Sequence, residues 1–149
     1  MTHARFASRL LQVTAFTLMP FFYGCGSSDS SAPAVLSADM DIDTLLQQGE
    51  ELYSQNCATC HYGGGGGGQN PSLFTSSIVK GSPEGLMKVI LQGQRGVSMV
   101  DGRKLNGIMP AQAYLNDVEV AAIATYVRRE FGKVEEPVQP AVVARFRQK

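Results

Sequence analysis

The sequence Cys57-Ala58-Thr59-Cys60-His61 is the stretch that decides the expected fold. Two cysteines separated by two residues and followed at once by a histidine are typical of covalent haem attachment, in which each thiol forms a thioether to the porphyrin. The histidine is then held beside the porphyrin and can serve as an axial ligand of the iron. The motif therefore predicts one covalently bound c-type haem.

Two other uses of these residues remain open from the motif alone. A structural zinc site needs four ligands, and His3 and Cys25 are the only further histidine and cysteine in the chain. A thioredoxin-like redox pair would follow a strand and precede a helix, whereas the six glycines of residues 63–68 follow here. Haem is the favoured interpretation, with zinc binding and dithiol chemistry as its alternatives.

The segments around this motif resemble those of a class I cytochrome c domain, in the order typical of that family. The similar segments are Gly49 with Leu52-Tyr53, the haem motif itself, Asn70-Pro71-Ser72-Leu73, residues 91–96, Met109-Pro110 and residues 117–128. The resemblance is closest to the bacterial exported type that serves as an electron-transfer subunit or soluble partner of dehydrogenases and oxidases. It implies an all-α class I cytochrome c fold over residues 41–132, with three to five helices around one haem. Residues 133–149 are expected to be a C-terminal tail.

The resemblance also implies roles for individual residues. Cys57 and Cys60 would bind the haem covalently, while His61 would be one axial ligand of the iron. The Pro71 carbonyl would accept a hydrogen bond from the other ring nitrogen of His61, which orients the ligand. Arg95 would reach a haem propionate, where a guanidinium stabilises negative charge.

Met109 is the expected second axial ligand. Met40 precedes the first expected helix and Met87 falls inside a later one, where a methionine usually fills core space. Met99 and Met109 both lie in an expected irregular segment between helices. Met109 is followed by proline, which restricts its backbone to extended conformations, and it precedes the last helix as the ligand does in the family. Met99 is the reserve candidate.

The N-terminal residues predict export. Residues 1–24 are predicted to be a signal peptide, because Arg5 and Arg9 precede an apolar stretch over residues 10–23. Cys25 follows this stretch and resembles the lipidated cysteine of bacterial lipoproteins; an ordinary signal peptide or an uncleaved anchor is the alternative. Residues 25–40 are expected to be a flexible spacer. The protein is therefore expected in the periplasm, or tethered to the membrane through Cys25 and facing the periplasm.

Local signals also predict helix positions. Asp41 or Asp43 can cap a first helix that contains Gly49, and the resemblance implies that Tyr126 of the last helix packs over this glycine. Asn116 and Glu119 have the spacing of a capping box at the start of that last helix.

These features predict an electron carrier that is not an enzyme. Nothing indicates nucleic-acid binding, because 13 basic and 13 acidic residues give no basic excess. The carrier would pass single electrons between redox partner proteins, from a dehydrogenase donor to an oxidase or reductase acceptor, using His/Met ligation. The alternative is a dedicated cytochrome c subunit of a periplasmic dehydrogenase or terminal oxidase complex. A further alternative is a haem-based gas sensor or peroxidase-like enzyme in which Met109 leaves the iron.

Overall fold

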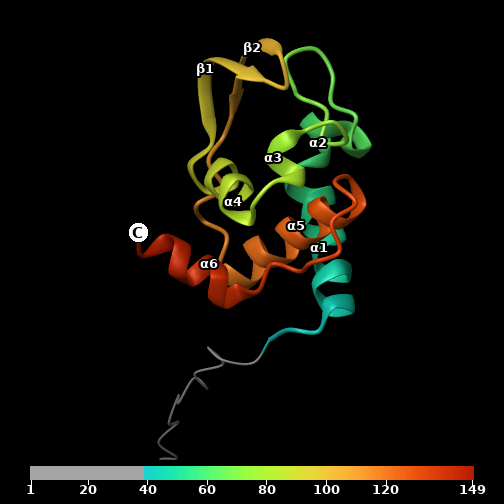
Figure 1. Cartoon of the computed structure of the whole chain (residues 1–149), viewed down its shortest axis with the longest axis vertical. Coiled ribbons are helices and arrows are strands. Elements are labelled where there is room, and N and C mark those ends of the chain that lie inside the picture. Colours follow the sequence, from blue (N-terminus) through green and yellow to red (C-terminus); the bar gives the residue numbers. More distant parts are fainter. Residues whose placement is uncertain (1–38) are drawn as a thin grey trace, which may run out of the picture. The chain divides into compact units, whose positions relative to one another are not determined.

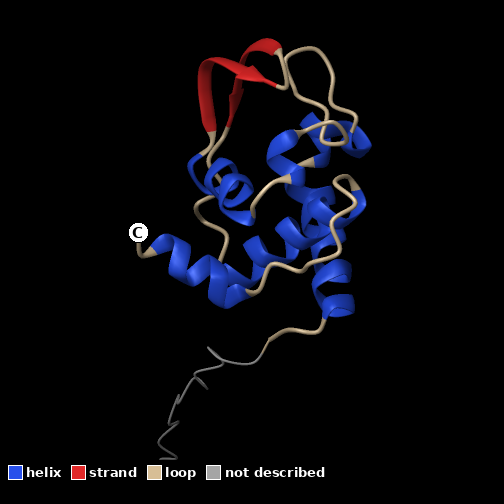
Figure 2. Cartoon of the chain, viewed as in Figure 1, coloured by secondary structure: helices blue, strands red, loops and turns tan. Residues whose placement is uncertain are grey.

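The computed structural model describes residues 39–149, which form six α-helices, one 3-10 helix and a two-stranded sheet (Figures 1 and 2). The elements, in chain order, are α1 (Ile42–Asn56), α2 (Ala58–His61), η1 (Tyr62–Gly64), α3 (Ser77–Lys80), α4 (Pro83–Gln92), β1 (Gln94–Val100), β2 (Arg103–Met109), α5 (Asp117–Glu130) and α6 (Pro140–Arg147). The predicted signal peptide, Cys25 and most of the spacer lie outside the described residues.

Helices α1 and α5 cross in close contact at Gly49. A Cβ atom at this position would lie 2.6 Å from the Cβ of Tyr126 and would overlap the carbonyl oxygen of Ala122. Glycine therefore allows the two backbones to approach more closely than any other residue would, which outweighs its cost of about 1 kcal/mol inside a helix. The expectation that Tyr126 packs over Gly49 is confirmed.

The two predicted helix starts are also confirmed by their hydrogen bonds. The Asp41 carboxylate accepts a bond from the Thr44 backbone N–H at 3.0 Å, at the start of α1. At the start of α5, the Glu119 N–H donates to the Asn116 side chain at 3.0 Å, and the Asn116 N–H donates to the Glu119 carboxylate at 2.7 Å. This reciprocal pair satisfies two backbone donors that the helix itself leaves free.

A β-hairpin stands where the sequence analysis expected an irregular segment, so the all-α prediction is only roughly right. Strands β1 and β2 pair antiparallel with Gln94 opposite Met109, and the loop between them consists of Asp101 and Gly102. Both loop residues have positive φ, 50° and 78°, as a two-residue turn of type I′ requires. Asp-Gly is a strong hairpin signal, so Asp101-Gly102 could have predicted this turn from the sequence.

The number of helices also differs from the prediction of three to five, because the described residues contain six. Part of the difference comes from α2 and α3, which have only 4 residues each. The other addition is α6, in the segment that was expected to be a tail.

Helix α6 extends the packed domain beyond residue 132. Val143 of α6 and Val138, just before it, are both buried in the core. The Val138 backbone N–H donates to the Thr125 hydroxyl of α5 at 2.9 Å. The Arg147 guanidinium pairs with the Asp117 carboxylate at 2.6 Å. Residues 133–149 therefore cover one side of α5 and are part of the folded unit.

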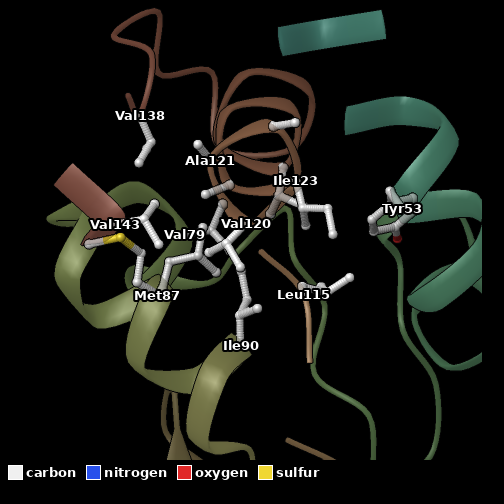
Figure 3. Close-up of a cluster of buried hydrophobic side chains, with 14 of the residues drawn as sticks. Tyr53, Val79, Met87, Ile90, Leu115, Val120, Ala121, Ile123, Val138 and Val143 are labelled. Carbon is white, nitrogen blue, oxygen red and sulfur yellow. The ribbon is translucent and has the colours of Figure 1, made fainter. Parts of the chain in front are cut away.

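The hydrophobic core lies between α4, α5 and α6, whose apolar side chains point toward one another in Figure 3. Met87 of α4 has no exposed surface and belongs to this cluster, together with Ile123 of α5 and Val143 of α6. Burying one such side chain stabilises the fold by about 1.5–3 kcal/mol. The core thereby holds α4 and α5 in place, and these are the helices from which the hairpin departs and to which it returns.

Arg128 is a buried cation that connects α5 to the end of α3. Its guanidinium donates to the carbonyls of Val79, at 3.4 Å, and Gly81. These carbonyls are among those that a helix end leaves without partners. Arg128 therefore fixes the position of Val79, which lines the cavity described next.

Candidate functional site

A cavity of about 180 Å³ brings together most of the residues that the sequence analysis singled out. Cys57, Cys60, His61, Pro71 and Met109 all line it. The remaining wall is largely aliphatic, and its apolar members include Leu73, Ile78, Val79, Leu86, Val89, Val100 and Leu105. Such a wall suits a flat apolar macrocycle, because burying apolar surface is favourable.

The two cysteines and the histidine lie on one turn of helix. The backbone N–H groups of Cys60 and His61 both donate to the Cys57 carbonyl, at 3.2 and 3.0 Å. Residues at positions i, i+3 and i+4 share one face of a helix, so the two thiols and the imidazole are presented on the same side. Both thiols are free of disulfide bonding and are available to form thioethers.

The ionisation of Cys57 does not fit a dithiol redox catalyst. Burial, with a smaller effect from Cys60, raises the pKa of the Cys57 thiol to about 11. Reactive CXXC pairs instead have a nucleophilic cysteine whose pKa is lowered below about 8. The site therefore favours haem attachment over thioredoxin-like chemistry.

The described residues also do not form a zinc site. Among residues 39–149, no group of three or more histidine, cysteine, aspartate or glutamate side chains is placed to hold a metal ion. A structural zinc site needs four such ligands, so the haem motif of this domain offers too few.

His61 is in the state that an iron ligand requires. The side chain is only 9% exposed, and burial lowers its pKa, partly opposed by the nearby Pro71 carbonyl. The ring is thus held in its neutral form, which is the form that binds metals. Its Nδ1 is buried and forms no hydrogen bond with any described residue, so the expected bond to the Pro71 carbonyl is not made in this structure, although that carbonyl is close enough to raise the pKa of the ring. An imidazole that turns one nitrogen toward a backbone carbonyl has the other available for a metal.

Two glycines of the six-glycine run place the chain beside His61 and Pro71. Gly64 has a φ of 84°, and a Cβ there would overlap the ring of Phe131. Gly66 has a φ of 64°, and a Cβ there would lie 2.7 Å from the carbonyl carbon of Pro71. A residue with a side chain would be strained at both positions. The close approach of Gly66 also brings the loop into contact with the Pro71 carbonyl.

Met109, the expected second axial ligand, lines the same cavity as His61. It is the only methionine among the described residues that lines the cavity. Met87 is a core residue, and Met99 is 67% exposed on β1 without lining the cavity. The backbone next to Met109 packs on Gly93, where a Cβ would lie 2.7 Å from the nitrogen of Ala111.

Arg95 is not part of the cavity wall, and its contact with a haem propionate stays a prediction. Its side chain is exposed and it is not one of the residues that line the cavity. Successive residues of a strand point to opposite faces, and the neighbours of Arg95 that line the cavity are Gln94 and Ser98. The expectation had placed Arg95 in a loop, where this alternation does not apply.

The contribution of the hairpin to the cavity wall was not predicted from the sequence. Val100 of β1 and Leu105 of β2 are buried and line the cavity. The Asp101-Gly102 turn was the signal that could have identified the hairpin, but the apolar residues Val97 and Met99 lie on the opposite face from Val100 and Leu105, so the sequence pattern does not identify the inward face.

Together, the fold and this cavity define a class I cytochrome c domain that carries one covalently bound c-type haem. Residues 44–127 match the family model described as cytochrome c oxidase, cbb3-type, subunit III. The chain belongs to this cytochrome c family.

Two similar proteins support the same assignment. A cytochrome c-552 from Thermus thermophilus is 35% identical over 94 residues, which cover 59% of this chain and 71% of that protein. A second cytochrome c-552, from a particular strain of the same species, is also 35% identical over 94 residues and is covered over 63% of its length. Haem-based electron transfer is therefore the general function of this domain.

Proposed function

We propose that this protein is a single-electron carrier outside the cytoplasm, with His61 and Met109 as the axial ligands of its haem. The observation that carries the proposal is that Cys57, Cys60, His61 and Met109 line one aliphatic cavity. When bound there, haem supplies one-electron chemistry at its iron, while the protein sets potential and access.

Each of these residues has a distinct part in the proposal. Cys57 and Cys60 would form the thioethers that prevent the cofactor from dissociating. His61 would bind the iron as a neutral imidazole, oriented by the Pro71 carbonyl. The Met109 thioether would occupy the opposite position, and a methionine ligand raises the reduction potential of a haem. With both axial positions filled by the chain, little rearrangement would accompany the gain or loss of an electron.

The absorption spectrum of the haem-loaded protein tests this ligation. Met99 provides a matched control, because it is a methionine on the same hairpin that does not line the cavity. We expect a far-red sulfur-to-iron band in the oxidised wild type and in Met99→Ala, and its loss in Met109→Ala. A band lost only in Met99→Ala would make Met99 the ligand. No band in the wild type, together with carbon monoxide binding to its reduced form, would overturn the carrier proposal.

We further propose that the protein is not an enzyme. A gas sensor or peroxidase-like enzyme would need an open axial position, and peroxide chemistry would also need a distal acid–base group. His61 is the only histidine of residues 39–149, and in this proposal it is bound to the iron. The carbon monoxide experiment tests this alternative directly.

A dedicated subunit of a respiratory complex is the second candidate function. The description of the matching family, which names a subunit of an oxidase, favours it, whereas the two similar cytochromes c-552 carry no such name. Size-exclusion chromatography of mildly solubilised membranes separates the two: a subunit elutes with a large complex, and a carrier elutes alone. Transient redox contacts are usually smaller than about 1,200 Å² and would not survive this step.

Export and lipid attachment are proposed from residues 1–25, outside the described part of the chain. Cleavage before Cys25 and acylation of this cysteine would tether the domain to a membrane through the spacer. Within residues 39–149, no helix combines the length and hydropathy needed to cross a bilayer. Mass spectrometry of the mature N-terminus tests the proposal: a diacylglyceryl mass on Cys25 supports it, and an unmodified N-terminus elsewhere contradicts it.

A further inference from the structure

The β1–β2 hairpin carries Met109 but has little packing on its outer face. Val97 and Met99 are 60% and 67% exposed, and neither lines the cavity. Only Val100 and Leu105 of the two strands are buried. A two-stranded hairpin is marginally stable by itself, so contacts with the rest of the domain must hold it over the cavity.

One of these contacts lies at the tip of the hairpin. The backbone N–H and the hydroxyl of Ser77 both donate to one carboxylate oxygen of Asp101, at 3.1 and 2.6 Å. Ser77 is the first residue of α3, whereas Asp101 is the first residue of the hairpin turn. These hydrogen bonds are charge-assisted, and such bonds are shorter and stronger than neutral ones.

A second contact lies along the side of β2. The Asn106 backbone N–H donates to the Gln69 side-chain oxygen at 2.7 Å. Gly107 packs on the same residue, because a Cβ there would lie 3.2 Å from the Gln69 carbonyl oxygen. Gln69 lies between the six-glycine run and Pro71, on the His61 side of the cavity. This contact therefore connects the two sides that would supply the axial ligands.

The hairpin backbone is tightly packed at Gly93, at its base, and open at Gly96. Gly93 and Gly96 both have positive φ, 67° and 79°, and nothing lies within 4 Å of where a Cβ of Gly96 would be. Met109 is directly across from Gln94, next to this base. Gly96 pairs with Gly107, so a bend at this point leaves the Gln94–Met109 pair at the base, and a displacement of β2 reaches Met109 through the neighbouring residues Asn106 and Gly107.

We propose that Asp101 and Gln69 are positioning residues for Met109. Through Ser77 and the Asn106 backbone, they hold the hairpin over the cavity and keep the Met109 sulfur toward the iron. The inference rests on the proposed Met109 ligation. It assigns to two residues outside the haem motif a control over how readily the methionine is displaced.

Binding of imidazole to the oxidised, haem-loaded protein measures this displacement. Asp101→Ala should bind imidazole about tenfold more tightly than the wild type, since a hydrogen bond to a charged group is worth roughly that factor. Gln69→Ala should show a smaller increase, because its bond to the Asn106 backbone is neutral and exposed. The double variant should bind it more tightly than either single variant. The far-red band should weaken in parallel as imidazole is added.

Three matched variants separate positioning from general stability. Asp101→Asn keeps an acceptor oxygen but loses the charge, so its effect should be smaller than that of Asp101→Ala. Asn106→Ala keeps the backbone N–H that donates to Gln69, so it should bind imidazole like the wild type. Ser77→Ala removes only one of the two bonds to Asp101 and should have an intermediate effect, which gives a measurement even if Asp101→Ala folds poorly.

The outcomes distinguish the two proposals. If Asp101→Ala and Gln69→Ala bind imidazole like the wild type, whether or not they unfold more easily, the positioning role is wrong while Met109 ligation stands. If the wild type already binds imidazole as tightly as Met109→Ala does, Met109 is not the ligand and the proposed function fails with it.

Discussion

The His61 side and the Met109 side of the cavity are built in different ways. His61 lies on a short helix, is buried, and has a carbonyl contact with Tyr53 of a four-ring aromatic cluster. Met109 lies at the end of an exposed hairpin that long-range polar contacts hold in place. The first side is fixed by dense packing and the second by a few hydrogen bonds.

This difference indicates where a haem ligand would be exchanged. Displacing His61 would require opening a packed interior, which is close-packed and resists local change. Displacing Met109 would require breaking a small number of contacts at the surface. We therefore expect the reduction potential and the resistance to foreign ligands to be set mainly on the Met109 side, and retention of the cofactor on the His61 side.

The largest effect is expected from the cysteines on the His61 side. The double variant Cys57→Ser, Cys60→Ser should lose covalently bound haem completely, because no thiol of the haem motif remains to form a thioether. Cys60→Ser alone should keep one attachment and part of the haem. Intact-protein mass spectrometry after denaturation measures both. Haem retained covalently by the double variant would mean that the attachment lies elsewhere.

The next effect concerns the crossing of α1 and α5 that supports the His61 side. Gly49→Ala should lower the free energy of unfolding by about 1–3 kcal/mol, because its Cβ would overlap the α5 backbone. Gly85→Ala is the control, because its Cβ in α4 would lie 3.9 Å from Ile78; it should stabilise by up to about 1 kcal/mol. Denaturant titration measures both changes. Equal effects at the two positions would contradict the close crossing.

A smaller effect is expected within the six-glycine run. Gly66→Ala should destabilise by more than about 1 kcal/mol and should alter the haem spectrum, because it combines a positive φ with contact against Pro71. Gly67→Ala, with open space around its Cβ, should be close to neutral. Thermal unfolding followed in the haem absorption band compares the two. If Gly66→Ala leaves the stability and the haem spectrum unchanged, the glycine loop does not support His61.

The smallest effect concerns Tyr53, which is also on the His61 side. At neutral pH, Tyr53→Phe should cost less than about 1 kcal/mol, because its hydroxyl bond to the His61 carbonyl is long, at 3.4 Å. Burial raises the pKa of Tyr53 to about 12 from an ordinary value of 10.0. The unfolded state therefore loses this proton first, so wild-type stability falls as the pH rises from about 10 toward 12.

The phenylalanine variant lacks this ionisation, so the deficit of Tyr53→Phe should shrink or reverse above about pH 10. Unfolding measured at neutral pH and at several more alkaline values follows the difference between the two proteins. A difference that does not change with pH would show that Tyr53 ionises equally in the folded and unfolded states.

Several features of this protein could be predicted from its sequence because they depend on neighbouring residues. The haem motif requires only the spacing of Cys57, Cys60 and His61 along one turn of chain. The capping box of Asn116 and Glu119 is likewise a matter of residues three apart. The resemblance then added the Gly49–Tyr126 contact, which joins distant parts of the chain.

Other features were decided by the tertiary structure, because they depend on which face of an element is turned inward. In a strand, a shift of one residue moves a side chain to the opposite face. The expectation of an irregular segment over residues 94–109 carried no such alternation, whereas in the hairpin Arg95 is an exposed strand residue. The same alternation turns Met99 outward, and the register of β2 places Met109 at the cavity. Helix α6 was not predicted, because its burial depends on the contacts of Val138 and Val143 with the rest of the domain. These contacts join distant parts of the chain and are not visible in a local sequence pattern.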